Sequence, residues 1–212
     1  MELKLEHVST AEVYKLLIGC VVPRPIAWIT SQSLDGVVNL APFSFFNAVA
    51  SNPPTISVSF AYNVQNQDGL KDTLANIQQT GEFVVNTATE PHEVHVNESA
   101  INYPRERGEP HELGIETLPS ALVLPPRLAL APVALECRLE RQIPVGEGPG
   151  SATLVLARVL HAYIRDELVN ERMHVDVKAL APIGRLAGHD YCYVHEVFTL
   201  RRRSFEEHNE VG

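Results

Sequence analysis

No stretch of this sequence is apolar enough, for long enough, to cross a membrane. The longest apolar-leaning stretch, residues 121–135, contains three prolines and Arg127, whereas a membrane-spanning helix needs about 20 predominantly apolar residues. Residues 1–6 also lack the basic start and the apolar run that are typical of a signal peptide. We therefore expect a cytoplasmic protein with no membrane partner.

Cysteine and positive charge are also scarce. Cys20, Cys137 and Cys192 are widely spaced and form no CxxC pair, which favours free thiols in a reducing compartment over a disulfide framework. Lysine and arginine total 17 against 26 aspartates and glutamates, which gives a net charge of −9 at pH 7. Such a protein lacks the basic surface that nucleic-acid binding requires, so we expect no nucleic-acid partner. A local cluster of cations and helix N–H groups can still bind a small anion.

The composition supports one domain with a sizeable core. Hydrophobic residues make up 45% of the 212 residues and charged residues only 20%, which excludes the disordered and coiled-coil classes. We expect a single domain over residues 1–200. Residues 201–212, which begin with three arginines, are expected to form a solvated tail.

Strand patterns outnumber helix patterns along the chain. Strands are predicted over residues 26–31, 37–40, 55–60, 82–86, 133–145, 151–164 and 191–200, with a hairpin turn at 34–36. Helices are predicted over residues 9–19, 72–79 and 91–100, and residues 105–119 are expected to be an irregular surface segment. Ser9 and Glu12 form a capping-box pattern; Asp72 is the predicted N-cap of the second helix, which Gly81 ends. Strands joined mainly by turns indicate a mainly β fold, an antiparallel barrel or sandwich with peripheral helices.

Two motif-like segments fail the requirements of the sites that they suggest. Residues 146–150, Gly-Glu-Gly-Pro-Gly, lack the G-x-G-x-x-G spacing and precede a predicted strand, so we interpret them as a hairpin loop. His92 and His95 are one residue closer together than the two ligands of an H-E-x-x-H zinc site. We therefore expect no metal site.

Residues 39–48 form a less ordinary segment, in which small and polar residues are interspersed with three phenylalanines. Pro42 removes a backbone donor and stiffens the chain, and the segment keeps no regular period. Backbone N–H groups beside aromatic rings suit a flat heteroaromatic ligand with acceptors along one edge. A buried crossover that packs its phenylalanines into the core explains the same pattern equally well.

Lys71, Asp72 and Thr73 stand at the start of the clearest predicted helix. First-turn N–H groups, the positive end of the helix dipole, a lysine and a threonine hydroxyl together suit a monophosphate. Asp72 would repel that phosphate unless its carboxylate turns toward the N–H groups of the first turn. Considered alone, the pattern favours a simpler alternative, in which Asp72 caps the helix and Lys71 is solvated.

These segments, in this order, resemble the flavin reductase-like, FMN-binding split-barrel family. The matching strings are residues 23–30 (PRPIAWIT), 39–47 (NLAPFSFFN), 52–60 (NPPTISVSF), 71–77 (KDTLANI) and 80–86 (TGEFVVN), then 125–127 (PPR), 134–137 (ALEC) and 182–186 (PIGRL) with Tyr191. The resemblance spans nearly the whole chain, and the ordered set in the first half is its specific part. Two places depart from the family pattern: Ala187-Gly188, where the family has a glycine pair, and residues 105–114.

The resemblance implies a Greek-key barrel of about six antiparallel strands, a homodimer, and FMN near the subunit interface. Arg24 is a candidate second cation for the phosphate or for the dimer partner. The cofactor-binding residues implied by the resemblance are Trp28, Ile29, Thr30, Asn39, Pro42, Phe43, Ser44, Phe45 and Asn47 around the ring, and Lys71, Asp72 and Thr73 around the 5′-phosphate.

The activity that the resemblance implies is NAD(P)H-dependent flavin reduction, with hydride passing from nicotinamide C4 to flavin N5. The cofactor carries this chemistry, so we assign no catalytic residue; His189, Arg185 and Tyr191 are candidates for the face that NADH or NADPH approaches. Reduced flavin would then serve a monooxygenase or another redox partner. Two alternatives remain open: an FMN-carrying electron-transfer protein without NAD(P)H activity, and a split barrel that has exchanged flavin for haem or another phosphate-bearing ring.

Overall fold

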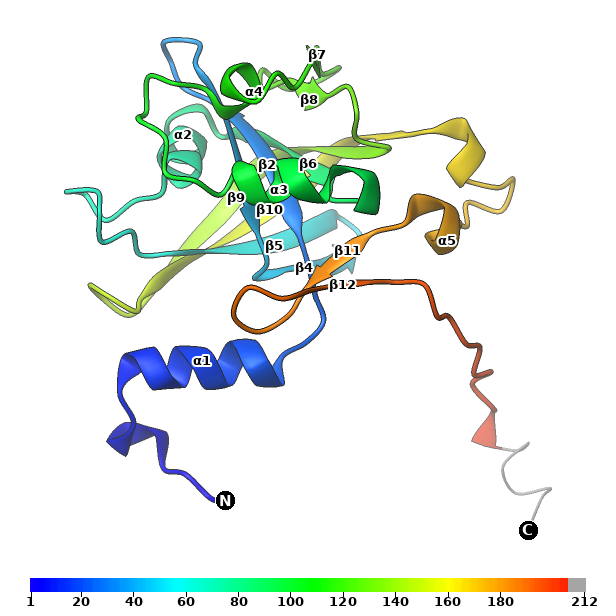
Figure 1. Ribbon diagram of the computed structural model, residues 1–212. Helices are drawn as coiled ribbons and strands as arrows, with labels where there is room; N and C mark the ends of the chain where they lie inside the picture. The colour runs from blue at the N-terminus through cyan, green and yellow to red at the C-terminus, as the bar shows by residue number, and fades with distance from the viewer. Residues whose placement is uncertain (206–212) are drawn as a thin grey trace.

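A seven-stranded antiparallel sheet forms the centre of the protein and curls into a partly open barrel (Figure 1). The computed structural model describes residues 1–205. In spatial order the strands are β3 (Val38–Phe43), β2 (Ala27–Gln32), β6 (Glu82–Thr87), β9 (Val133–Val145), β10 (Ala152–Ile164), β5 (Pro54–Ala61) and β4 (Phe46–Ser51). The predicted mainly β, antiparallel fold with peripheral helices is confirmed.

The sheet curls because its two outermost strands are consecutive in the chain. Only Ser44 and Phe45 connect β3, at one edge, to β4, at the other. This link reaches about 11 Å at most, whereas six strand spacings of a flat sheet add up to about 29 Å. The N–H of Ser59 in β5 donates to the carbonyl of Phe45 at 2.8 Å. The two edges therefore meet beside the β3–β4 link.

The hairpin of β9 and β10, with 13 residues in each strand, joins the two halves of the barrel. β10 pairs with β5 over residues 152–158, whereas β9 pairs with β6 over residues 134–138. Register shifts between Leu156 and Ala157 and after Val159 interrupt the ladder, and such irregularities increase the local twist. The loop at residues 146–150, whose three glycines have positive φ, is the hairpin loop that the sequence predicts.

Short helices and two small sheets surround the barrel, and no helix in residues 1–205 is long and apolar enough to span a membrane. The α-helices are α1 (Thr10–Cys20), α2 (Asp72–Thr80), α3 (Glu93–Glu98), α4 (Glu109–Glu112) and α5 (Val177–Leu180); the 3-10 helices are η1 (Leu5–His7), η2 (Glu90–His92) and η3 (Asp166–Leu168). β1 (Arg24–Pro25), β11 (Ile183–Arg185) and β12 (Tyr191–Tyr193) form one small sheet, and β7 (Thr117–Leu118) with β8 (Arg127–Leu128) the other.

The core lies on both sides of β2. Successive residues of a strand face opposite sides of the sheet. Ala27 and Ile29 accordingly face the inside of the barrel, where they pack with Phe60, and Trp28 faces a second cluster that includes Val96 of α3. Both faces of β2 are therefore buried.

The N-terminal helix begins as predicted. The side chains and backbones of Ser9 and Glu12 bond reciprocally in a capping box, and α1 ends at Cys20, one residue after the predicted Gly19. Of its residues only Ile18 is buried. The helix therefore lies at the margin of the molecule, as Figure 1 shows.

Two predicted elements near the C-terminal half are wrong in extent. The last strand ends at Tyr193 rather than at residue 200, because β11, with which it pairs, is itself three residues long. Residues 105–119 are not merely a surface segment, since Glu109, Pro110 and Ile115 are buried. Of the predicted tail, residues 201–205 are exposed, and residues 206–212 lie outside the described part of the chain.

Candidate functional site

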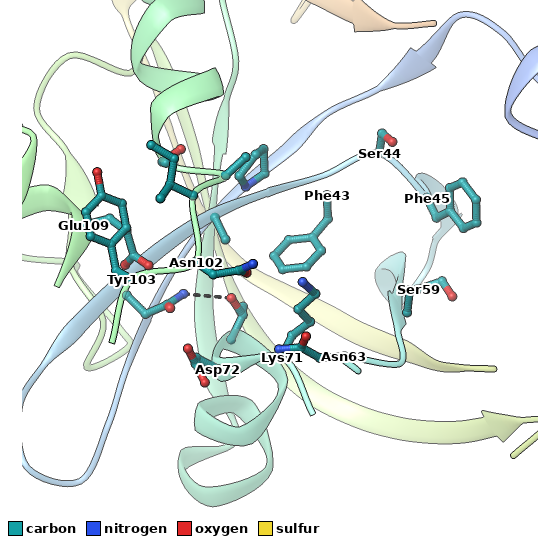
Figure 2. Close-up of a pocket in the computed structure, with 18 of the residues that line it drawn as sticks. Phe43, Ser44, Phe45, Ser59, Asn63, Lys71, Asp72, Asn102, Tyr103 and Glu109 are labelled. Carbon is teal, nitrogen blue, oxygen red and sulfur yellow. Dashed lines mark hydrogen bonds between the residues drawn. The ribbon is translucent and has the colours of Figure 1, made fainter. Parts of the chain in front are cut away.

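A pocket of about 290 Å³ opens where the edges of the barrel meet. Its sheet wall comprises residues 39 and 41–45, from β3 and its link to β4, with Ser59 and Ala61 of β5. Its loop wall comprises Asn63, residues 71–73, residues 99–103 and Glu109. Figure 2 shows Phe43 from the sheet wall and Lys71 from the loop wall directed into the same space. The two segments singled out in the sequence thus line one pocket from opposite sides.

The sheet wall presents a fixed aromatic surface. The rings of Phe43 and Phe60 meet edge to face, with their centroids 4.7 Å apart. Phe60 is only 1% exposed, so the barrel core supports Phe43 from behind. This surface suits a flat ring.

Fewer backbone donors face the pocket than the sequence suggests. Leu40 and Pro42 direct their backbones to the free edge of β3, because alternate residues face the same edge of a ladder. The N–H of Leu40 donates to Oε2 of Glu109 at 2.8 Å, and proline has no N–H. The remaining pocket-lining donors of this segment are at Ser44 and Phe45, past the end of β3.

The loop wall begins at the N-terminus of α2. Lys71, not Asp72, is the N-cap residue, and Asp72 makes no capping hydrogen bond. Its carboxylate instead turns away from the helix to Arg105, which corrects the prediction of an aspartate cap. Gly81, in the left-handed conformation with φ of 75°, ends the helix as predicted.

Thr73 is held by the sheet wall. Its side-chain oxygen accepts a hydrogen bond of 2.8 Å from Nδ2 of Asn39, drawn as the dashed line in Figure 2. Both residues are buried. Because that oxygen already accepts a bond, the hydroxyl proton of Thr73 is left to point toward another acceptor.

Glu109 is a pocket residue that the sequence did not indicate. It is 6% exposed, and desolvation raises the pKa of its carboxyl to about 7. Gly108 permits this approach of α4 to β3, because a Cβ there would lie 2.5 Å from the carbonyl oxygen of Val38. The only sequence signal was Gly108-Glu109-Pro110, inside a segment whose composition is typical of a surface loop.

Eight of the predicted cofactor-binding residues line the pocket: Asn39, Pro42, Phe43, Ser44, Phe45, Lys71, Asp72 and Thr73. The structure does not bring the other four there. Trp28, Ile29 and Thr30 are fully buried in β2, whose backbone is paired with β3 on one side and β6 on the other. Asn47 is exposed on β4, where its side chain accepts from the N–H of Ala48.

Arg24 is not available as a second phosphate cation. It is 6% exposed and donates to the carbonyl oxygens of Ile18, Val21 and Leu186. Desolvation lowers the pKa of its guanidinium group. Arg24 therefore ties α1 to the segment after β11.

A smaller cavity of about 200 Å³ adjoins the pocket and shares four lining residues with it: Tyr14, Pro42, Ser44 and Ala100. Arg185 and Tyr191, two of the candidates for the nicotinamide approach, line this cavity, with the guanidinium carbon 4.4 Å from the ring centroid. His189 is exposed and is not among its lining residues.

Thiols and histidines supply no competing site in the described residues. Cys20, Cys137 and Cys192 are all free, as predicted, and burial raises the pKa of the Cys137 thiol. Within residues 1–205 no group of three or more His, Cys, Asp or Glu side chains could hold a metal ion.

The comparisons with known proteins agree with this geometry. The sequence model of the flavin reductase like domain matches residues 18–181. An uncharacterized protein of Halalkalibacterium halodurans is 40% identical over 213 aligned positions, which cover 99% of this chain and all of the relative.

Two solved structures are similar over nearly their full length. Nitrilotriacetate monooxygenase component B from Bacillus cereus is 35% identical, with a TM-score of 0.88 over 94% of this chain and 98% of that one. The 2-nitrobenzoate 2-nitroreductase NbaA of Pseudomonas fluorescens is 30% identical, with a TM-score of 0.86 over 97% and 98%. A protein with a split barrel domain, from Shewanella frigidimarina, is 16% identical and shares the fold at a TM-score of 0.81 over 96% of this chain and all of that one. The fold is therefore the predicted split barrel, and the chain belongs to the flavin reductase-like family.

Proposed function

We propose that this protein is an FMN-binding oxidoreductase that uses NADH or NADPH to reduce flavin. The observation that carries the proposal is the pocket itself: an aromatic wall faces a lysine across a single opening, in a chain of the flavin reductase-like family. When bound, the flavin supplies the hydride acceptor. The work of the chain is to bind, orient and partly shield it.

The sheet wall fits the ring of the flavin. Phe43, supported by Phe60, supplies a flat apolar surface, and Ser44 and Phe45 supply backbone N–H groups for acceptors on the edge of the ring. Trp28, Ile29 and Thr30 support this wall from within the sheet, since β2 pairs with β3 along its whole length. Their role is to fix the position of β3.

The loop wall fits the phosphate of FMN. Among residues 1–205 the Lys71 ammonium group forms no ion pair and no side-chain hydrogen bond, so its charge is available to an anion. The Thr73 hydroxyl and the first N–H groups of α2 lie beside it. A monophosphate ester is the part of FMN that matches this set.

The redox partner is the second part of the proposal. Component B, at 35% identity, belongs to a monooxygenase, and NbaA, at 30%, is a nitroreductase. Reduced flavin could therefore be delivered to a separate monooxygenase, or its electrons passed to a small acceptor at the same pocket. The adjoining cavity with Arg185 and Tyr191 gives either a nicotinamide or an acceptor a route to the sheet wall.

The test is an anaerobic absorbance experiment on the FMN-loaded protein. Mixing with NADH, and separately with NADPH, is expected to bleach the flavin band with one donor or both. A stable yellow protein that ignores both donors would overturn the reductase proposal and favour the electron-transfer alternative. Failure to retain FMN at all would favour the third alternative, a split barrel for another ligand.

A pair of lysine variants tests the site. Lys71→Ala is expected to weaken FMN binding by about tenfold or more, the effect of one lost charge-assisted contact. Lys178→Ala, in the exposed helix α5, is the matched control and is expected to leave FMN binding unchanged. Unchanged affinity in Lys71→Ala would remove the phosphate site from the proposal.

We also propose that the protein is a homodimer. Tyr14 and Leu17 of α1 are 55% and 48% exposed and lie three residues apart, so they form one apolar face of the helix that a second copy of the chain would cover. Sedimentation velocity is expected to give the mass of two chains, and Leu17→Glu to shift it toward one. A monomeric wild-type protein at micromolar concentration would contradict this proposal.

A further inference from the structure

Three charged groups form a cluster that includes Asp72, the residue after Lys71 in the chain, and Asp72 also lines the pocket. Asp68 and Asp72 lie on the segment that leads into α2, and Arg105 lies on the loop that follows α3. The guanidinium group binds both carboxylates: Nη2 is 3.2 Å from Oδ2 of Asp68, and Nε donates to Oδ1 of Asp72. One arginine thus joins Asp72 of the loop wall to Asp68, which lies outside the wall.

Because Arg105 binds both acids, neither of them forms an ion pair with Lys71. Lys71 lies directly before Asp72 and three residues after Asp68, so these two carboxylates are the nearest acids to it along the chain. Both carboxylates bind the guanidinium group of Arg105, and Oδ1 of Asp72 also accepts a hydrogen bond from Nδ2 of Asn66 at 3.3 Å. The ammonium group of Lys71 therefore keeps its charge uncompensated, on the wall of the pocket rather than in an ion pair.

The charge balance shows what the arginine contributes. Lys71 and Arg105 together balance Asp68 and Asp72, so the four groups sum to zero. Without Arg105 the sum would be −1, and neither acid would have the ion pair that it now forms. A phosphate with about two negative charges would then be repelled by the carboxylates and would compete with them for Lys71.

We propose that Arg105 is a positioning residue for phosphate recognition: it binds Asp68 and Asp72, keeps Lys71 free for the 5′-phosphate of the flavin, and so sets the preference for FMN over riboflavin. This inference rests on the proposed function. It also explains how a phosphate can bind beside Asp72, whose negative charge would otherwise repel it. The carboxylate is neutralised by an arginine from a distant loop rather than by the helix N–H groups.

The test compares FMN with riboflavin, which lacks the phosphate, by quenching of flavin fluorescence on binding. Wild-type protein is expected to bind FMN more tightly. Arg105→Gln is expected to lose about tenfold or more in affinity for FMN but less than about twofold for riboflavin, because only the phosphate senses the uncompensated carboxylates. Arg105 is half exposed, so the variant should fold, which circular dichroism verifies.

The double variant Arg105→Gln with Asp72→Asn distinguishes positioning from direct contact. Removing the carboxylate is expected to restore most of the FMN affinity that Arg105→Gln loses. No restoration would overturn the proposal, since it would mean that Arg105 binds the phosphate itself or only holds the loops together. Arg107→Gln, which breaks a nearby ion pair with Glu112 at 3.2 Å, is the matched control and is expected to change neither affinity.

Flavin binding and the role of Arg105 are tested separately. A wild-type protein that binds neither flavin would overturn the proposed function. A wild-type protein that binds FMN and riboflavin equally, or an Arg105→Gln variant that loses affinity for both flavins alike, would leave flavin binding in place and overturn only the role of Arg105.

Discussion

The two walls of the pocket are built in different ways. The sheet wall is part of a continuous ladder: β3 is paired along its length with β2, and Phe43 rests on the core residue Phe60. The loop wall combines turns with the starts of α2 and α4, and its Asp72 is bonded to Arg105, which also binds Asp68 outside the wall. The shape of the pocket is thus set by the sheet wall, which is part of the stable core of the protein. Charge is set in part by exposed groups, since the side chains of Arg105 and Asp68 are each about half exposed.

The largest expected effect concerns the support of the sheet wall. Phe60→Ala would leave a cavity beneath Phe43 and is expected to lower the free energy of unfolding by about 3–5 kcal/mol. Urea denaturation of the protein without ligand measures it. Phe45→Ala, at a position 41% exposed on the same wall, is the control and should cost less than about 1 kcal/mol. Equal losses in the two variants would mean that the wall is not supported through the core.

The next effect lies where the two walls meet, at Glu109. Its carboxyl has a pKa of about 7 in the folded protein and an ordinary value of 4.5 when exposed. Between these values the folded state binds more protons than the unfolded state, so the free energy of unfolding falls as the pH rises from 4.5 to 7. Above pH 7 the carboxyl of Glu109 is ionised in the folded protein, and keeping this charge buried lowers the free energy of unfolding.

Glu109→Gln cannot ionise and still offers an oxygen to the N–H of Leu40. The variant is therefore expected to gain stability relative to wild type between pH 5 and pH 8, by at most about 3 kcal/mol. Urea denaturation at both pH values measures this difference, with Glu106→Gln, an exposed carboxyl of the same loop, as the matched control. A difference that stays constant with pH would show that Glu109 is already ionised at pH 5.

The walls also differ in how far the sequence revealed them. Residues of the string at 39–47 and the Lys71-Asp72-Thr73 triplet line the pocket. The local pattern left the first undecided and favoured a simple helix cap for the second, whereas the family resemblance assigned both to a ligand. Arg105 and Glu109 act through partners more than 30 residues away, which no local pattern encodes.

The prediction for Trp28, Ile29 and Thr30 shows the same limit. A strand pattern does not say which neighbours pair with it. Here β3 and β6 pair with the two edges of β2, so the backbone N–H and C=O groups of β2 are hydrogen-bonded within the sheet. Whether a strand is central or at an edge decides which of its donors a ligand can reach.

A third prediction tests the join between the central strand and the loop wall. The indole N–H of Trp28 donates to Oγ of Ser99 at 2.8 Å, and both side chains are buried. Ser99→Ala would leave that N–H without an acceptor and is expected to cost about 1–3 kcal/mol of unfolding free energy. Thermal and urea denaturation measure it. Ser120→Ala, which removes a partly buried serine hydroxyl bonded to a backbone carbonyl instead, is the control and should cost less.

The smallest expected effect lies within the loop wall. Nδ2 of Asn102 donates to Oε1 of Gln65 at 2.6 Å, an exposed bond between the two loops that flank the pocket. Asn102→Ala is expected to change the free energy of unfolding by less than about 1 kcal/mol, because water replaces an exposed partner. Hydrogen exchange of the backbone amides in residues 99–108 should nevertheless become faster, since local opening needs less free energy than global unfolding. Faster exchange confined to this loop, beside unchanged exchange in β3, would show that the two walls open independently; a parallel change in β3 would show that they open as one unit.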